Sequence, residues 1–189
     1  MELSLLEYRR LALMALWTGL IATVGIVLAL VPNLEFVILS AFLGGVALGK
    51  KGGLIVAALG EAIFSAINPI GSGLGFPILY VFQIFSVGFC GFIGGFFSSS
   101  AMFEKPRVVH IIILGIIGFI LTVIFDVLTA LSFPLSSGIV DGTLWGTLSL
   151  GLIFFAMHTI SNTVLFALFG PNLIRLIKRT LLMNGLAPS

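Results

Sequence analysis

The chain has 189 residues, of which 59% are hydrophobic and only 8% are charged. Because a soluble domain carries about 25% charged residues, this composition excludes an ordinary water-facing surface and predicts an integral membrane protein. The length favours a single membrane domain over residues 1–189. The lone Cys90 excludes a disulfide framework and a cysteine-based metal site.

The first long apolar run follows Arg9-Arg10 and ends at the turn signal Pro32-Asn33. It is long enough to cross a hydrocarbon core of about 30 Å, and it lacks the short core and cleavage site of a signal peptide. Two shorter runs flank Gly49–Gly53, and each by itself would also fit a re-entrant segment. The six predicted helices span about residues 11–31, 36–48, 54–67, 78–97, 108–131 and 144–169, and Gly170-Pro171-Asn172 is expected to end the last one before a short basic tail, 170–189.

The placement of basic residues favours crossing by all six runs. The nine Lys and Arg residues lie before the first run, between the second and third, between the fourth and fifth, and in the tail. With six crossings they all face one side, which the positive-inside rule assigns to the cytoplasm. The sequence therefore predicts an all-α, six-helix bundle with both termini cytoplasmic. The tail is interpreted as an anchor near anionic lipid, and no nucleic-acid partner is expected.

The stretch from Glu61 to Gln83 looks most like a binding site. A carboxyl group inside an apolar run is followed by Asn68-Pro69 and by the glycine-rich segment 71–75. Irregular backbone between two lipid-length segments is tolerated only where protein buries it or where it lines a watery cavity. Because a carboxylate is costly at membrane depth, Glu61 is expected to be protonated or hydrogen-bonded.

Other polar side chains near or within the apolar runs mark candidate positions for a solute site. Each also has a structural interpretation: the aromatic ones as interface anchors, the amides and histidine as interhelical hydrogen-bonding groups, and Asp126 as a hydrated surface group. His158 and Asn162 are four residues apart and share a helix face. The candidate solute-binding residues are Glu35, Asn68, Ser72, Tyr80, Gln83, Asp126, Trp145, His158 and Asn162, with Glu61 as an intramembrane carboxyl group.

The predicted outer half holds Glu35, Asp126 and Asp141 but no Lys or Arg. A pocket there would suit a neutral or cationic solute better than an anion, with aromatic faces and polar side chains as its contacts. Backbone amides of the glycine-rich segment could also cradle an anion.

Motifs for catalysis and for metal binding are absent from the sequence. Gly49–Gly52 lacks the remainder of a phosphate-binding loop, and the two histidines lack metal-ligand spacing. Ser72 would need glycines two residues away on each side to resemble a nucleophile elbow, but these positions hold Ile70 and Leu74. The sequence predicts neither an enzyme nor a resident cofactor or metal.

Four segments carry a resemblance to a known family: VPNLEF, AFLGGVALGKKGG, INPIGSGLGFP and GFCGFIGGFF, all within residues 11–97. In their order they resemble the substrate-binding subunits (S components) of energy-coupling factor (ECF) vitamin transporters. The resemblance implies a multi-pass protein of a prokaryotic cell membrane that binds a micronutrient from outside. It also implies partners, namely a membrane coupling subunit and two cytoplasmic ATPases, so that ATP hydrolysis would lie outside this chain.

Docking in that family uses small residues of the first helix, typically Ala-x-x-x-Ala. The corresponding residues here are Ala15 and Gly19, with Thr18 and Ala22 as an alternative pair. Small residues four apart also occur at Gly45 and Gly49 and at Gly91 and Gly95, which predicts close helix packing.

Two questions about function stay open at this stage. The alternative to an uptake subunit is a self-sufficient ion-coupled secondary transporter or channel, with Glu61 and His158 as a proton relay. An intramembrane enzyme is a third hypothesis without a supporting motif. For an uptake subunit, a thiamine-like or cobalamin-like cargo fits the lack of basic pocket residues better than biotin, folate or pantothenate.

Overall fold

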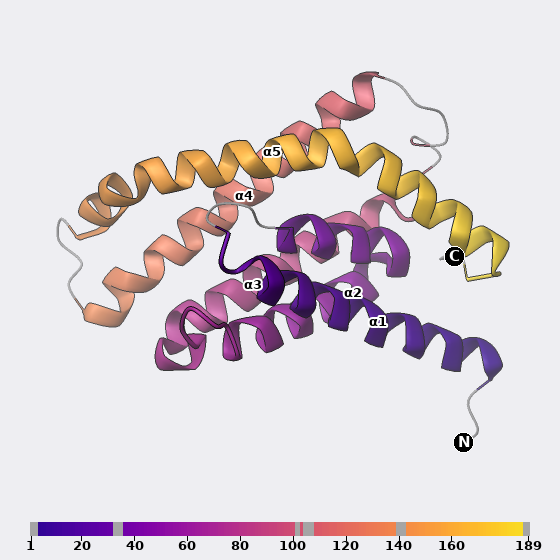
Figure 1. The fold of residues 1–189 in the computed structure, drawn as a ribbon, viewed down its shortest axis with the longest axis horizontal. Helices are drawn as coiled ribbons and strands as arrows, with labels where there is room; N and C mark the ends of the chain where they lie inside the picture. The colour runs from indigo at the N-terminus through magenta and orange to yellow at the C-terminus, as the bar shows by residue number, and fades with distance from the viewer. Residues whose placement is uncertain (1–3, 32–35, 101–102, 104–107, 139–142, 187–189) are drawn as a thin grey trace.

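The computed structural model describes residues 4–31, 36–100, 103, 108–138 and 143–186, and every element within them is a helix. This confirms the predicted all-α class. Figure 1 shows the elements, which are α1 (Leu5–Leu28), α2 (Val37–Ala66), η1 (Gly73–Gly75), α3 (Pro77–Gly94), η2 (Gly95–Phe97), α4 (Val108–Ser137) and α5 (Thr143–Met183).

All five α-helices are long and apolar enough to cross a membrane. Much of their apolar surface faces outward, as at Leu16, Ile112 and Ile153, which are 70%, 56% and 78% exposed. An outer surface of this kind is compatible with lipid and not with water. The helices therefore have the character that the composition predicts for a membrane protein.

The element α2 consists of two helical halves that meet at Gly49. Gly49 has φ 77° and ψ 179°, a backbone conformation that is essentially restricted to glycine. A β-carbon on Gly53 would overlap the Cα of Gly45, so the chain doubles back and the two halves pack against each other. The predicted connection Gly49–Gly53 is thus reduced to the Gly49 kink, since Lys50 already lies in the second half.

Glycines let both halves of α2 approach α3 closely. A β-carbon on Gly45 would overlap the Gly91 carbonyl oxygen, and one on Gly94 would overlap the Phe42 carbonyl oxygen. A β-carbon on Gly95 would overlap the backbone of Lys50. The small residues at these positions therefore serve packing inside the bundle.

Three helix ends differ most from the predicted ones. α1 begins at Leu5 because Ser4 and Glu7 form a capping box, in which the Glu7 side chain accepts from the Ser4 N–H at 2.6 Å. α4 runs past residue 131 to Ser137 with Pro134 inside it. The interpretation of residues 170–189 as a tail after a helix end is wrong, since α5 continues through Pro171 to Met183.

Packing explains why Pro171 does not end α5. Ile174 and Leu181 beyond it are 0% and 5% exposed and belong to the hydrophobic core. Gly170 lies against Leu114 of α4, where its missing side chain permits the contact. Burial of these residues outweighs the local effect of one proline, as is common in membrane helices.

The helices form two groups, α1 to α3 and α4 with α5 (Figure 1). α2 packs on α1 and α3, and α4 packs along α5 with Gly118 against Phe166. The two groups are in contact where α2 packs on α5 and where α3 packs on α4. Between α2 and α5, the rings of Phe42 and Phe166 pack edge to face with their centres 5.4 Å apart.

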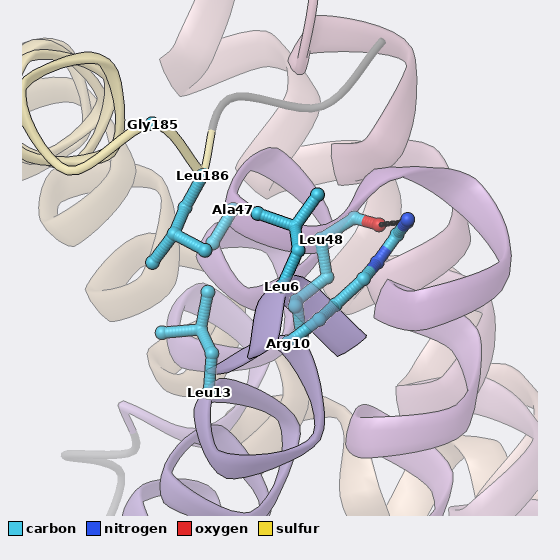
Figure 2. Close-up of a pocket in the computed structure, with 7 residues that line it drawn as sticks. All are labelled: Leu6, Arg10, Leu13, Ala47, Leu48, Gly185 and Leu186. Atoms are coloured by element: carbon cyan, nitrogen blue, oxygen red, sulfur yellow. Dashed lines mark hydrogen bonds between the residues drawn. The ribbon is translucent and has the colours of Figure 1, made fainter. Parts of the chain in front are cut away.

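The described basic residues lie toward one end of the bundle. A small pocket of about 60 Å³ lies there, and Arg10 of α1 donates to the Leu48 carbonyl oxygen at 3.5 Å. Figure 2 shows this contact near Leu186, which follows α5. Lys50 lies 3.7 Å from the centre of the Phe96 ring, and Lys178 donates to the Ser100 carbonyl oxygen. The start of α1, the kink of α2, the segment after α3 and the end of α5 therefore meet at this basic end.

Candidate solute-binding cavity

A cavity of about 680 Å³ lies between the two helix groups, away from the basic end. Its α1 residues begin at Gly25, whereas the basic pocket contacts the same helix at Leu6, Arg10 and Leu13. The volume is within the range of about 300–1,000 Å³ typical of small-molecule sites. The lining residues are Gly25, Leu28, Ala29, Leu30, Val31, Glu61, Phe64, Asn68, Ile70, Gln83, Phe125, Asp126, Thr129, Phe154, Phe155 and His158.

One wall carries a buried pair between α4 and α5. Asp126 Oδ1 lies 2.7 Å from His158 Nδ1, and Thr159 Oγ1 lies 3.4 Å from Asp126 Oδ2. Asp126 and His158 are 5% and 3% exposed. Phe125 and Phe154 pack around the imidazole, with ring centres 5.8 Å and 6.3 Å from it. The pair fixes both polar groups at the cavity wall and joins the two helices there.

Asn162 lies one turn beyond His158 and does not line the cavity. It is 0% exposed, and its Nδ2 donates to the His158 carbonyl oxygen at 3.2 Å. Its Oδ1 accepts no hydrogen bond from the residues that the structure describes. The predicted shared face with His158 is therefore only partly used for the cavity, and the described hydrogen bond of Asn162 stays within α5.

Glu61, on the second half of α2, also lines the cavity, and it is 1% exposed. Close packing of α1 on α2 places it there, since a β-carbon on Gly25 would lie 2.5 Å from the Phe64 ring. One turn after Glu61, Ser65 Oγ donates to Gln83 Oε1 at 2.8 Å. This contact brings Gln83 of α3 to the same side of the cavity as Glu61.

The connection between α2 and α3 is held by its own polar side chains. Asn68 Oδ1 accepts from the Ile70 N–H at 2.9 Å, which forms an Asx turn. Ser72 Oγ donates to the Ala66 carbonyl oxygen at 2.7 Å and accepts from the Leu74 N–H at 3.2 Å. These hydrogen bonds fix the conformation of the connection, and its residues Asn68 and Ile70 line the cavity.

The structure brings together part of the predicted set. Glu61, Asn68, Gln83, Asp126 and His158 line one cavity although they come from α2, the connection after it, α3, α4 and α5. The remaining candidates have other positions: Ser72 and Tyr80 bond backbone carbonyls of α2, Trp145 is 72% exposed, Asn162 is buried and bonds a backbone carbonyl of its own helix, and Glu35 is outside the described residues.

Sequence reasoning missed the aromatic part of the lining. Phe64, Phe125, Phe154 and Phe155 all face the cavity. A signal was available, because Phe125 precedes Asp126 and Phe154 lies four residues before His158, which is helical spacing. In a chain with 18 Phe residues that signal is weak.

The charges of the lining residues are unbalanced. Glu61, Asp126 and His158 are the ionisable groups at the wall, and no Lys or Arg occurs among the described lining residues. No group of three or more His, Cys, Asp or Glu residues in the described part of the chain could hold a metal ion. The lining therefore offers hydrogen-bonding groups, two carboxyl side chains and aromatic faces.

The proposed docking residues of α1 have different surroundings. Ala15 and Gly19 are exposed, and nothing lies within 4 Å of a β-carbon built on Gly19. Ala22 is 5% exposed, and the Thr18 carbonyl oxygen lies against Gly60 of α2. Of the two predicted pairs, Ala15 and Gly19 are open to a partner, whereas the other packs within the bundle.

No protein-family model, curated protein or solved structure matches this chain. The chemistry of the cavity must therefore be inferred from its own residues.

Proposed function

We propose that this chain is the substrate-binding subunit of an ECF-type importer and captures a small water-soluble nutrient in the cavity between its helix groups. The observation that carries the proposal is the cavity itself, which is of ligand size and lined by polar residues from both groups. The resemblance of residues 11–97 to S components supplies the transport context.

In this proposal both halves of α2 cross the membrane, which makes six crossings in total. The basic end then faces the cytoplasm together with both termini of the chain. The cavity, at the other end, opens to the outside of a prokaryotic cell. Support comes from the contacts of Arg10, Lys50 and Lys178, which lie on different helices but at one end.

The exposed Ala15–Gly19 face of α1 is the proposed docking surface for a membrane coupling subunit. Small side chains there would let a partner helix approach closely. Two cytoplasmic ATPases bound to that subunit would drive uptake, so the chain itself is proposed to bind solute and not to hydrolyse ATP.

The size of the cavity favours a thiamine-sized cargo over cobalamin. A corrinoid is far larger than the vitamins otherwise considered, and about 680 Å³ would enclose only part of it. Carboxylate vitamins would meet the carboxyl groups of Glu61 and Asp126 without a compensating Lys or Arg among the described lining residues.

The test is to purify the full chain in detergent and identify small molecules that leave it on denaturation by mass spectrometry. We expect one nutrient in near-stoichiometric amount. The variant Thr129→Trp, which fills the cavity, should lose it. The matched control Thr23→Trp places the same side chain on an exposed position of α1 and should retain it. Equal ligand content in both variants would show that the cavity is not the binding site.

A second candidate is an ion-coupled secondary transporter. It is favoured by one observation, namely that Glu61, Asp126 and His158 line the same cavity and could relay a proton. Solute or proton flux in liposomes that contain only this chain would support this candidate. Uptake that requires added coupling subunit and ATPases would support the importer.

A further inference from the structure

Ser65 of α2 lies behind the cavity wall and bonds Gln83 of α3, which lines the cavity. Ser65 is 3% exposed, and its hydroxyl donates to Gln83 Oε1 at 2.8 Å. The hydroxyls of Ser86, Thr122 and Thr163 instead donate to the carbonyl oxygen four residues earlier in their own helices, as hydroxyls in apolar helices commonly do. The Ser65 hydroxyl thus serves a contact between two elements, and that contact ends on a cavity residue.

Gly73 of η1 packs directly on the Ser65 hydroxyl. A β-carbon on Gly73 would overlap Ser65 Oγ and would lie 3.1 Å from the Tyr80 ring, so only glycine fits there without a shift. Tyr80 in turn donates to the Ala62 carbonyl oxygen at 3.1 Å, which ties the start of α3 to the same part of α2. The position of the connection between α2 and α3 therefore determines the space that the Ser65 hydroxyl has.

The bond from Ser65 determines which end of the Gln83 amide is left for a solute. A glutamine amide carries one acceptor oxygen and one NH₂ donor group. Since Ser65 occupies the oxygen, Gln83 offers its Nε2 hydrogens. Asn68 in the same lining has the same bias, because its Oδ1 accepts from the Ile70 N–H, and a backbone N–H can only donate. Both amides therefore offer donors, and a matching solute group is a hydrogen-bond acceptor, such as a carbonyl oxygen or a ring nitrogen without a hydrogen.

We propose that Ser65 is a positioning residue for solute recognition. Packed under Gly73, it fixes the Gln83 amide with its NH₂ group available to the cavity, and the cavity selects a solute that has an acceptor at this point. The inference rests on the proposed solute-binding function and adds a specificity-determining residue that does not touch the solute. Without the Ser65 hydroxyl the amide is free to turn over, and its oxygen would then meet the acceptor of the solute.

The Gln83 amide can be observed by itself, because Gln83 is the only glutamine in the chain. With ¹⁵N in the glutamine side chain, the full protein in detergent gives one pair of amide proton signals by NMR. We expect Ser65→Ala to shift and broaden this pair as the amide samples two orientations. Ser86→Ala is the matched control, since it removes a buried hydroxyl whose described bond stays within α3, and it should leave the pair in place. Unchanged signals in Ser65→Ala overturn the inference.

Gly73→Ala reaches the same contact from the connection. Its added carbon displaces the Ser65 hydroxyl, so it should change the Gln83 signals without altering either bonded side chain. Gly71→Ala is the control in the same connection, because nothing lies within 4 Å of a β-carbon there. This pair keeps the test decisive if Ser65→Ala does not fold. Gln83 signals that are the same in both glycine variants contradict the inference.

The binding measurement uses the small molecules that the unaltered protein releases on denaturation. This extract is added back to protein freed of solute by washing, and it should shift the Gln83 signals of the unaltered protein. We expect Ser65→Ala and Gly73→Ala to bind its solute about two- to tenfold more weakly, the effect of about one hydrogen bond. Ser86→Ala and Gly71→Ala should bind it like the unaltered protein. Altered amide signals with unaltered affinity would make Ser65 a purely structural residue and overturn the inference.

The two proposals fail in different ways. If Ser65→Ala binds the released solute normally and Thr129→Trp does not, the cavity is a solute site and only the positioning role is lost. If the unaltered protein releases no solute, the proposed function is lost, and the solute contact of Gln83 is lost with it, whatever the amide signals show.

Discussion

At the scale of single residues, the pair of Asp126 and His158 is the shortest described polar contact between α4 and α5 at the cavity. Its two atoms are 2.7 Å apart in a buried setting. Removing one partner of such a pair costs about 3–5 kcal/mol, because the other polar group stays buried. We expect Asp126→Ala to lower the unfolding free energy by about this amount in detergent.

A double-mutant cycle separates this coupling from lost packing. His158→Ala and the double variant complete the cycle, and we expect an interaction energy of about 0.5–3 kcal/mol. Ser149→Ala is a control, since Ser149 is exposed and bonds only the Trp145 carbonyl oxygen of its own helix among the described contacts. If the effects of the two substitutions are additive, the contact between Asp126 and His158 does not stabilise the packing of α4 on α5.

Glycine at the crossing of α2 and α3 gives a second prediction at this scale. A β-carbon on Gly91 would overlap the Gly53 carbonyl oxygen, so Gly91→Ala should destabilise the protein by about 1–3 kcal/mol. Gly19→Ala is the matched control in an open position and should be neutral or stabilising by up to about 1 kcal/mol. Thermal unfolding of the two variants in one detergent makes the comparison. The reverse order would contradict the packing described here.

The polar residues of the site were predictable one by one but not as an assembly. Asp126, His158 and Glu61 stand out because charged groups in apolar runs are costly. Asp126 and His158 are 32 residues apart in sequence. Their pairing depends on how α4 and α5 are rotated about their own axes. An apolar run without a clear polar face does not reveal that rotation. The same uncertainty placed Asn162 and Tyr80 in the site, although the structure gives them structural hydrogen bonds.

At the scale of elements, Gly49 decides how α2 folds. Its φ of 77° with ψ of 179° belongs to a region that other residues occupy only at a cost of about 1–3 kcal/mol. We expect Gly49→Ala to lower stability by that amount, although nothing lies within 4 Å of the added carbon. Gly71→Ala is the control, being equally open without a positive φ. If the two variants are equally stable, a side chain at residue 49 does not strain the kink, and the role assigned to Gly49 is wrong.

The structure has five long α-helices where the sequence predicts six, and several helix ends differ from the predicted ones. The short runs 36–48 and 54–67 are the two halves of α2, because Gly49 is both a turn residue and a packing residue. The sequence predicts that the last helix ends before Gly170, because glycine and proline usually end helices. Burial of Ile174 and Leu181 is a tertiary effect, and local sequence does not reveal it.

The exposed face of α1 gives a prediction about assembly. Gly19→Leu should leave solute binding unchanged and should not lower the melting temperature of the isolated chain, since no described atom lies within 4 Å of a β-carbon there. In cells that supply a coupling subunit and ATPases, the same variant should reduce co-purification of these partners and nutrient uptake. Val27→Leu adds bulk at another exposed position of α1 and should affect neither. Normal uptake with Gly19→Leu would exclude this face as the docking surface.

At the scale of the whole molecule, the two ends differ in chemistry. At the basic end, the pocket lined by Arg10 and Leu186 measures about 60 Å³, which is too small for a nutrient. The other end holds the large cavity between the helix groups. The proposed uptake function requires the cavity end to face the outside of the cell and the basic end to face the cytoplasm. The proposal therefore depends on the orientation of the protein in the membrane.

Cysteine labelling in intact cells tests that direction. In a Cys90→Ser background, a cysteine replaces either Ile70, which is 68% exposed at the cavity, or Lys51, which is exposed beside the kink of α2. With a membrane-impermeant maleimide we expect Ile70→Cys to react in intact cells and to be protected by the bound nutrient. Lys51→Cys should react only after permeabilisation. Labelling of Lys51→Cys from outside, with Ile70→Cys reacting only in permeabilised cells, would contradict the account.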